Sequence, residues 1–470
     1  MKLETLMATR PETAALQRYM VSMQATVLVS FAGLTLMACT SNEPYRTALP
    51  AACAVADCDD SPDTVIEQHG GYDLAFVEFT ERGNTFDRRR MNQVLDYVAK
   101  QAQHDPSNPD HGVITIVFVH GWKHNARADD ANVKSFRKLL YKASELSAGG
   151  PRKVIGVYVG WRGLSIDFGP VTNISYWERK ATAEQVAKGG VTELLLRLER
   201  EVIDDVRPNR NLYLVTGHSF GGAVVLSALN EVFLERVVEA TAKNPEDACV
   251  ESRPFGHGVV LLNPAIEANE VLQLKELVAE TCFTPGQDRL MHVISSDADQ
   301  ATNKAFGLGQ WLGVNLTWRQ ATLTRELEGR DVEFQESDLD TITVGNFKPF
   351  QTGQLDHSDS ADSRWHYRSC IGEDAACIDP ADRAQHIPVK HNEPLAFIHT
   401  DATFIADHND VFNDNVSAYL AAIIAEARYK RALNDPSVVD ERLPPACRTE
   451  AFGPCFAFYQ GEFERVPSPP

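Results

Sequence analysis

Residues 211–222 read NLYLVTGHSFGG, an apolar run followed directly by a glycine-rich turn. The apolar residues 212–215 predict a buried strand, and an apolar helical pattern runs from Gly222 to about residue 240. Gly217 and Gly221 stand two residues either side of Ser219. Because larger side chains there would collide with the neighbouring strand and helix, Ser219 is expected in a tight, strained turn. The segment therefore predicts a strand–turn–helix unit with one serine at its tip.

Short apolar runs alternate with longer amphipathic ones on both sides of this unit. Residues 113–119, VITIVFV, form a continuous apolar run, mostly of β-branched residues, that is typical of a strand buried on both faces. Further strands are predicted at 74–79, 154–159, 259–262, 290–294 and 395–398, and helices at 88–101, 130–146, 181–205 (broken near Gly189-Gly190), 266–280 and 413–427. This alternation predicts an α/β fold, with a mostly parallel central sheet and helices on both faces. Such sheets bind their ligands at the carboxyl ends of the strands.

The composition is that of an ordinary globular protein. Of the 470 residues, 43% are hydrophobic and 23% are charged, which excludes a wholly disordered chain, a collagen-like repeat and a multi-span membrane protein. The 45 Lys and Arg residues against 65 Asp and Glu give a net charge of −20. Such an acidic surface repels phosphate backbones, so nucleic acid is not an expected partner.

The first 39 residues have the order of an export signal. Lys2, Arg10 and Arg18 precede an uncharged, largely apolar stretch at residues 21–38. That stretch ends in LMAC at 36–39, which resembles the lipobox of bacterial lipoproteins. The resemblance implies that Cys39 is lipidated and anchors the body in the cell envelope, and Thr40 favours the outer membrane, facing the periplasm or the exterior. The alternative is an uncleaved anchor helix, since about 18 apolar residues nearly span a bilayer.

The cysteines agree with export. Setting Cys39 aside leaves eight of nine, and these fall into neighbouring pairs: Cys53 with Cys58, Cys249 with Cys282, Cys370 with Cys377, and Cys447 with Cys455. Eight cysteines allow 105 connectivities, but pairs of close neighbours are the simplest expectation in an oxidising compartment. The chain has no CxxC or HExxH pattern, so neither a metal site nor a cofactor is predicted.

Two segments together resemble the α/β-hydrolase superfamily of esterase- and lipase-like serine hydrolases. They are the GHSFGG turn and the HGW sequence at 120–122, which directly follows the predicted strand 113–119. The segments VFVHGWKHN, GVYVGWRG and DHNDVFN look like an exported or lipoprotein subgroup of that superfamily. In this family the central serine of G-x-S-x-G is the nucleophile. The resemblance implies that Ser219 is the nucleophile and that the backbone amides of Trp122 and Phe220 form the oxyanion hole.

The family's chain order is nucleophile, acid, histidine. An acid is expected after a later strand, and the run at 290–295 leads into SDAD at 296–299. Asp299 is preferred because the sequence DQA at 299–301 resembles the D-x-A or D-x-x-V pattern that follows the acid in this family. Asp297 is the alternative, and Glu267 is a more distant one. The histidine is expected just before the last helix, which favours His408, with His399 as its rival.

These resemblances divide the chain into four parts. Residues 1–38 are interpreted as a signal peptide with a lipobox, 39–70 as a linker, 71–434 as an α/β-hydrolase domain and 435–470 as a Pro-rich C-terminal tail. Residues 303–393 are polar and interrupt the alternation, so they are interpreted as an insertion, and as a lid candidate, before the catalytic histidine.

The implied activity is that of a membrane-anchored serine hydrolase. It would cleave carboxylic esters through a Ser-His-Asp triad and an acyl-enzyme intermediate, with a small-molecule ester or a lipid as substrate and without a cofactor. Two alternatives stay open: a phospholipid or lipid acyl hydrolase whose anchor brings the site to the membrane, and a catalytically inactive binding lipoprotein of the envelope.

Overall fold

The computed structural model describes the greater part of the chain after residue 41. The described residues are 42–48, 62–103, 105, 107–108, 111–147, 152–163, 175–203, 210–243, 248–306, 321–327, 329–357, 365–371, 377–434, 443–448 and 452–467. The predicted signal peptide, Cys39 and the Cys53/Cys58 pair lie outside them. Within the described residues, no helix combines the length and the apolar character needed to cross a membrane.

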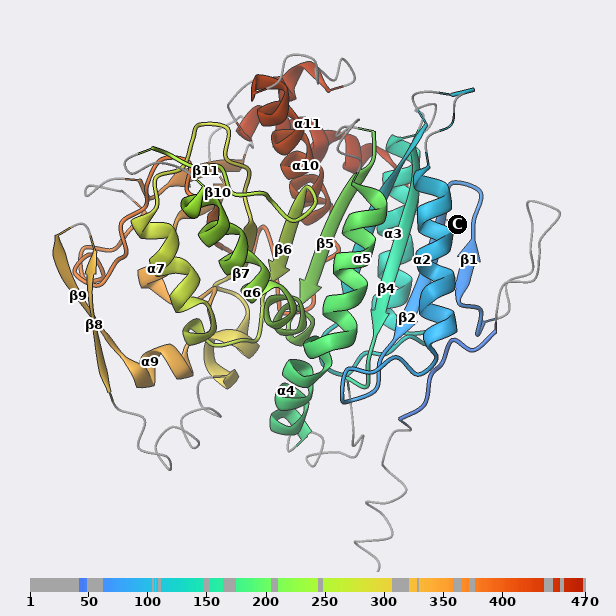
Figure 1. The fold of residues 1–470 in the computed structure, drawn as a ribbon, viewed down its shortest axis with the longest axis horizontal. Helices are drawn as coiled ribbons and strands as arrows, with labels where there is room; N and C mark the ends of the chain where they lie inside the picture. The colour runs from blue at the N-terminus through green and yellow to red at the C-terminus, as the bar shows by residue number, and fades with distance from the viewer. Residues whose placement is uncertain are drawn as a thin grey trace, which may run out of the picture.

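A ten-stranded sheet runs through the molecule (Figure 1). Its strands, in spatial order, are β1 (Ile66–Gln68), β2 (Tyr72–Glu78), β4 (Arg152–Gly160), β3 (Gly112–Val119), β5 (Leu212–His218), β6 (Gly258–Leu262), β7 (Met291–Ser296), β12 (Leu395–Thr400), β10 (Gly353–His357) and β11 (Trp365–Ser369). All neighbours from β2 to β10 are parallel, and only the edge strands β1 and β11 pair antiparallel. A separate antiparallel pair is formed by β8 (Thr322–Leu327) and β9 (Arg330–Gln335).

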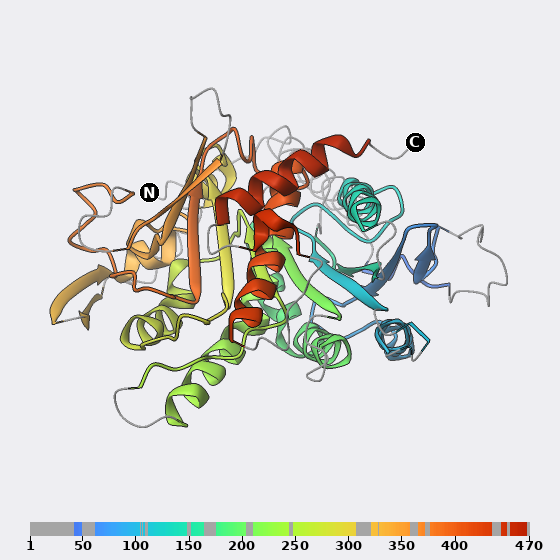
Figure 2. The same cartoon turned by 90° about the horizontal axis from the view of Figure 1, so that it is seen from above.

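Helices cover both faces of this sheet (Figures 1 and 2). One face carries α2 (Arg88–Ala102), α4 (Ser175–Val186), α5 (Thr192–Val202), α6 (Phe220–Ala242) and α7 (Leu272–Glu280), and the other carries α3 (Ala131–Leu146), α10 (Asp414–Asn434) and α11 (Phe452–Arg465). The shorter helical segments are η2 (Ala187–Val191), η3 (Ala268–Val271), η4 (Ala301–Ala305), α9 (Glu336–Thr341), η5 (Lys348–Phe350) and η7 (Pro445–Cys447).

Successive side chains of a strand serve two separate cores. In β3, Val117 and Val119 pack under α2 and α6, whereas Ile116 and Phe118 pack under α3 and α10. This explains why β3 is almost entirely apolar: both of its faces are buried, and Thr115 is the one polar side chain in the strand. The predicted α/β class, with a mostly parallel sheet flanked by helices, is therefore confirmed.

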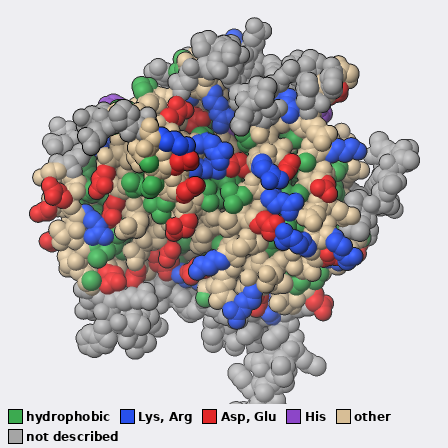
Figure 3. Space-filling model, in the orientation of Figure 1, with side chains coloured by type: hydrophobic (Ala, Val, Ile, Leu, Met, Phe, Trp, Pro, Cys, Tyr) green, Lys and Arg blue, Asp and Glu red, His purple; other side chains and the backbone are tan. Residues whose placement is uncertain are grey.

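Figure 3 views the molecule from the side of α5, α6 and α7. Acidic and basic side chains are interspersed over this face, so the net charge of −20 does not appear on it as one acidic patch.

Three local features differ in detail from the sequence expectations. Strand β1 lies inside the stretch interpreted as a linker, and the insertion contributes β10 and β11, which extend the main sheet beyond β12. The stretch interpreted as a Pro-rich tail contains helix α11, which packs against α10. Its Phe452, Phe456 and Phe463 lie on one side of the helix and join the core of that face, which compensates for the low helix propensity of its Gly and Pro residues.

The break expected in the predicted helix at 181–205 is present. Between α4 and α5, Lys188 and Gly189 leave helical geometry, and Gly189 has a φ of 97°. Three disulfides match the predicted pairing: Cys249–Cys282, Cys370–Cys377 and Cys447–Cys455.

Candidate active site

Ser219 occupies a strained turn between β5 and α6. Its φ is 55° and its ψ is −121°, a backbone conformation that favours glycine. A Cβ at Gly217 would lie 2.6 Å from the carbonyl oxygen of Gly221, and one at Gly221 would overlap the carbonyl oxygen of Val119. The glycines thus allow β5, α6 and the end of β3 to approach closely, and the turn holds Ser219 at the carboxyl edge of the sheet.

His408 lies between Ser219 and Asp299. Its Nε2 is 2.8 Å from the Oγ of Ser219, and its Nδ1 is 2.8 Å from Oδ2 of Asp299. Ser219 follows β5, Asp299 follows β7 and His408 lies in the loop between β12 and α10. The structure therefore brings three of the candidate residues from three distant segments into one hydrogen-bonded line.

Asp299 is fully buried and held on both oxygens. Oδ2 also accepts the hydroxyl of Thr302 at 2.6 Å, while Oδ1 accepts the backbone N–H groups of Ala301 at 2.8 Å and Thr302 at 3.2 Å. Burial alone would raise the pKa of Asp299, but the hydrogen bond and charge of His408, together with the bonds from Thr302, lower it below its usual value. A carboxylate is therefore favoured next to His408.

The rival candidates pair with each other. His399 Nδ1 lies 3.4 Å from Oδ1 of Asp297 and 3.1 Å from Nζ of Lys348. The hydrogen bond from His399 is the main cause that lowers the pKa of Asp297. Glu267 forms an ion pair with Lys180 at 2.6 Å, and burial raises its pKa. These residues form ion pairs and hydrogen bonds that are separate from the Ser219–His408–Asp299 line.

The HGW loop lies against the Ser219 turn. A Cβ at Gly121 would be 2.9 Å from the Cβ of Ser219, and Phe220 is the first residue of α6. The loop is braced from behind by His120, whose ring stacks on Trp161 at 5.5 Å between centroids and accepts the Trp161 backbone N–H at 3.1 Å. Burial lowers the pKa of His120 to about 4, which keeps this ring neutral. Trp122, partly buried, follows directly in the same loop.

Three further residues hold the His408 loop, and the sequence reasoning did not single them out. His218 Nε2 lies 2.7 Å from the carbonyl oxygen of His408, and Asn263 Nδ2 lies 3.5 Å from the same oxygen. Ser296 Oγ donates to the carbonyl of Ile405 at 2.7 Å. These side chains come from the ends of three neighbouring strands, β5, β6 and β7. Their only signal in the sequence is a polar residue at the end of an apolar strand.

The tautomer of His218 follows from its surroundings. It is buried, and burial lowers its pKa well below the usual value, so the ring is neutral. A neutral ring that contacts a carbonyl oxygen through Nε2 must carry its proton there. His218 therefore donates a hydrogen bond to the backbone of His408.

No group of three or more His, Cys, Asp or Glu side chains in the described part of the chain is arranged to hold a metal ion.

Comparison with known proteins gives only distant likenesses. No protein-family model matches the chain, and no curated protein matches it. Among solved structures, it is similar to a phospholipase, PlaB from Legionella pneumophila in complex with thio-NAD, with a TM-score of 0.23 and 14% identity over 68% of this chain and 64% of that one. It is also similar to an uncharacterized protein from Pseudomonas aeruginosa, with a TM-score of 0.18 and 12% identity over 48% of this chain and 42% of that one.

Proposed function

We propose that the chain is a serine hydrolase of the α/β-hydrolase fold that cleaves carboxylic esters. The observation that carries the proposal is the hydrogen-bonded line from Ser219 Oγ through both ring nitrogens of His408 to Asp299, with 2.8 Å at each step. The strained backbone of Ser219 supports it, because such strain concentrates where a side chain must be held in one position.

In the proposed reaction each proton transfer has a donor or an acceptor among these three residues. The Asp299 carboxylate accepts the proton on Nδ1 of His408, which leaves the lone pair of Nε2 directed at the Ser219 hydroxyl. His408 takes the hydroxyl proton as Oγ forms a bond to the ester carbonyl carbon, and then donates it to the departing alcohol. Water next attacks the acyl-enzyme: His408 takes a proton from the water and donates it to Oγ of Ser219 as the carboxylic acid leaves.

The negative charge on the carbonyl oxygen needs nearby donors. We assign this role to the backbone amides of Trp122 and Phe220, one from the loop after β3 and one from the residue after the nucleophile. Phe220 begins a helix of 23 residues, and the positive end of its dipole favours the developing oxyanion. A donor of this kind lowers an acyl-transfer barrier by about 3–4 kcal/mol.

Cys39 and the apolar stretch before it support a lipid anchor in the bacterial cell envelope as part of the proposal. An anchored enzyme meets lipid esters as well as soluble ones, so phospholipids are included among the proposed substrates. The inactive binding protein is the less favoured reading, because a protein without catalysis has no need for a strained serine aligned with a histidine and a buried aspartate.

Labelling with a fluorophosphonate, which reacts with activated serines, tests the proposal. The full-length chain should be labelled, while Ser219→Ala and His408→Ala should not. His399→Ala is the matched control, because it removes a histidine from the same sheet edge, and it should label like the native chain. Folded native protein that resists labelling would overturn the proposal. A series of esters of increasing acyl length, followed by phospholipid vesicles, then defines the substrate.

A further inference from the structure

Tyr45 and Arg46 are bound at the carboxyl edge of the sheet, the edge that carries Ser219. Their backbone N–H groups donate to the two carboxylate oxygens of Glu78, at 3.0 and 2.7 Å. Glu78 is the last residue of β2, and the arrowheads of the parallel strands β5 and β6 in Figure 1 point to the same edge. The start of the described chain is therefore tied to the side of the molecule where the proposed reaction takes place.

The side chain of Arg46 fixes this contact. It is 2% exposed, and its guanidinium group lies over the ring of Phe76, 3.6 Å from the centroid. Its Nε donates to the carbonyl of Ala126 at 2.7 Å, and its Nη1 donates to Glu67 at 2.8 Å. Release of the segment would separate a buried ion pair and leave an uncompensated charge behind, which is unfavourable. The segment therefore stays bound in the folded protein.

The bound segment lies near the proposed nucleophile across the sheet. Val77 of β2 is level with Gly217 of β5, through the registers of the intervening strands β4 and β3. Three strand spacings of about 4.8 Å separate the two residues, which amounts to about 14 Å. Ala126, which accepts a hydrogen bond from Arg46, also belongs to the loop after β3 that begins with the HGW sequence. The contact of Arg46 and the proposed oxyanion hole thus share one loop.

The proposed anchor is close to this point along the chain. Cys39 stands six residues before Tyr45. Six fully extended residues span at most about 22 Å. Helix α6, by comparison, runs from Phe220 at this edge to Ala242 near the opposite edge, and its 23 residues cover about 34 Å (Figure 1). The tether is therefore too short for the opposite edge to rest on the membrane that holds Cys39.

The segments beside the bound residues are locally basic. Residues 79–90 and 120–130 together contain six Lys and Arg against four Asp and Glu, whereas the whole chain has a net charge of −20. Arg82 and Lys123, one on each segment, are exposed. Anionic lipid surfaces attract basic residues that lie near them. The charge of these segments is therefore complementary to an anionic lipid surface.

We propose that the carboxyl edge of the sheet is the membrane-facing surface of the protein, and that the bound residues Tyr45 and Arg46 hold it there. The partner is the anionic lipid bilayer that carries the anchor at Cys39. This inference rests on the anchor in the proposed function and does not depend on the chemistry at Ser219. The proposed site then faces the lipid head groups, which favours lipid esters over soluble esters as its substrates.

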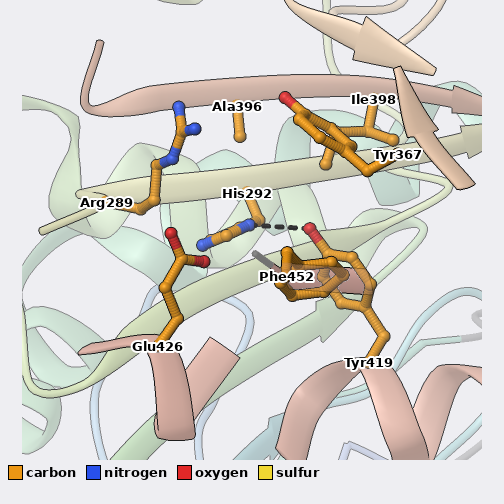
Figure 4. A pocket seen from close by; sticks show the side chains of 8 residues that line it. All are labelled: Arg289, His292, Tyr367, Ala396, Ile398, Tyr419, Glu426 and Phe452. Atoms are coloured by element: carbon orange, nitrogen blue, oxygen red, sulfur yellow. Dashed lines mark hydrogen bonds between the residues drawn. The ribbon is translucent and has the colours of Figure 1, made fainter. Parts of the chain in front are cut away.

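The side formed by α10 and α11 is a less suitable membrane contact. It contains a hollow of about 40 Å³ that is lined by Arg289 and Glu426 together with aromatic side chains (Figure 4). Its polar groups bind one another: His292 Nδ1 lies 2.9 Å from the hydroxyl of Tyr419, and Glu426 pairs with Lys430 at 3.0 Å. Transfer of charged groups from water into an apolar environment costs free energy, so lipid contact is not favoured there.

Energy transfer from the protein to labelled lipids tests the orientation. The full-length chain with Ser219→Ala is purified from bacterial membranes and reconstituted in phosphatidylglycerol-containing vesicles whose head groups carry an acceptor dye. A donor dye is attached to an unnatural side chain in place of Ala402 or of Ala242, which are both exposed. Ala402 follows β12 at the proposed membrane edge, and Ala242 ends α6. Transfer from position 402 should be at least about twofold more efficient. Equal transfer, or more efficient transfer from position 242, would overturn the inference.

Variants of the tether test whether its short length sets the orientation. Insertion of a flexible Gly/Ser segment of about 20 residues after Thr40 adds a mean span of about 25 Å and should abolish the difference between the two positions. The same segment appended after Pro470 is the matched control and should leave the difference unchanged. A difference that persists with the long tether would show that another surface holds the body at the membrane, and it would overturn the role of Tyr45 and Arg46.

Flotation separates this inference from the proposed anchor. The reconstituted chain should float with the vesicles after an alkaline carbonate wash. A chain that does not float would contradict the anchor, and the orientation with it. Flotation with equal transfer from positions 402 and 242 would contradict the orientation alone. Ester hydrolysis is not measured in either experiment, so a lack of catalysis would change neither result.

Discussion

Two aspartate–histidine pairs lie at the same edge of the sheet, and only one of them reaches a serine. Asp299 and Asp297 both follow β7, while His408 and His399 both lie in the segment from β12 to α10. Asp299 is fully buried and held by Thr302, whereas the Asp297 side chain is 69% exposed. His408 contacts Ser219, whereas His399 contacts Lys348. The two pairs share residue types and position, so the burial of the carboxylate and the contact with Ser219 distinguish the proposed catalytic pair from the Asp297–His399 pair.

The largest contrast is expected from the two histidines. His408→Ala removes the base next to Ser219 and should lower kcat for ester hydrolysis by about 10⁶-fold, as should Ser219→Ala. His399→Ala should change kcat by less than threefold. Steady-state assays on a soluble short-chain ester measure both, and comparable losses in the two histidine variants would show that the pairs are not functionally distinct.

The two aspartates should differ almost as much. Asp299→Asn keeps the size of the side chain but favours the wrong tautomer of His408, and we expect a loss of about 10⁴-fold in kcat. Asp297→Asn should leave kcat within a few-fold of the native value. An Asp297→Asn variant with the larger loss would reverse the assignment of the acid.

A smaller effect is expected from His218, one of the three residues that hold the His408 loop. His218→Leu removes the donor to the His408 carbonyl, and displacement of the base by about 1 Å costs on the order of 100-fold in rate. His218→Gln keeps an N–H donor and should restore most of kcat. A merely structural defect would not distinguish Leu from Gln, so equal kcat in the two variants, at matched thermal stability, would contradict this positioning role.

The smallest difference concerns stability in acid. The pKa of Asp299 is lower in the folded chain than in the unfolded chain, where it is about 3.9. Its carboxylate therefore stabilises the fold at pH values above the unfolded pKa, and this contribution is lost as the pH falls through the folded pKa. Denaturant unfolding between pH 2 and pH 6 should therefore be less pH-dependent in Asp299→Asn. For the exposed Asp297 pair we expect at most about 1 kcal/mol, reduced further by salt. A steeper pH dependence in Asp299→Asn than in the native chain would contradict the sign.

Local patterns in the sequence were sufficient for much of the fold. The buried parallel strands and the glycines around Ser219 have signatures that depend on only a few neighbouring residues. Three disulfides join cysteines at most 33 residues apart, so sequence proximity was informative. The α/β class and the turn at Ser219 could therefore be predicted.

Other features depend on contacts that the sequence does not display. Strand β10 has only five residues and becomes part of the sheet by pairing with β12. Helix α11 is stabilised by phenylalanines that pack on α10, against its own Gly and Pro content. The hydrogen bond from His218 to His408 spans 190 residues, and no local pattern indicates it. Such tertiary contacts override local propensity.

The backbone of Ser219 has a thermodynamic consequence for the whole chain. Its φ of 55° and ψ of −121° suit glycine, and a residue with a side chain in such a conformation costs roughly 1–3 kcal/mol. Ser219→Gly should consequently melt at a higher temperature than Ser219→Ala, although both lack the hydroxyl. Native proteins are stable by only about 5–15 kcal/mol, so one residue of this turn consumes a measurable part of that margin. The Ser219→Gly variant should therefore be more stable than the native chain, although it lacks the proposed nucleophile.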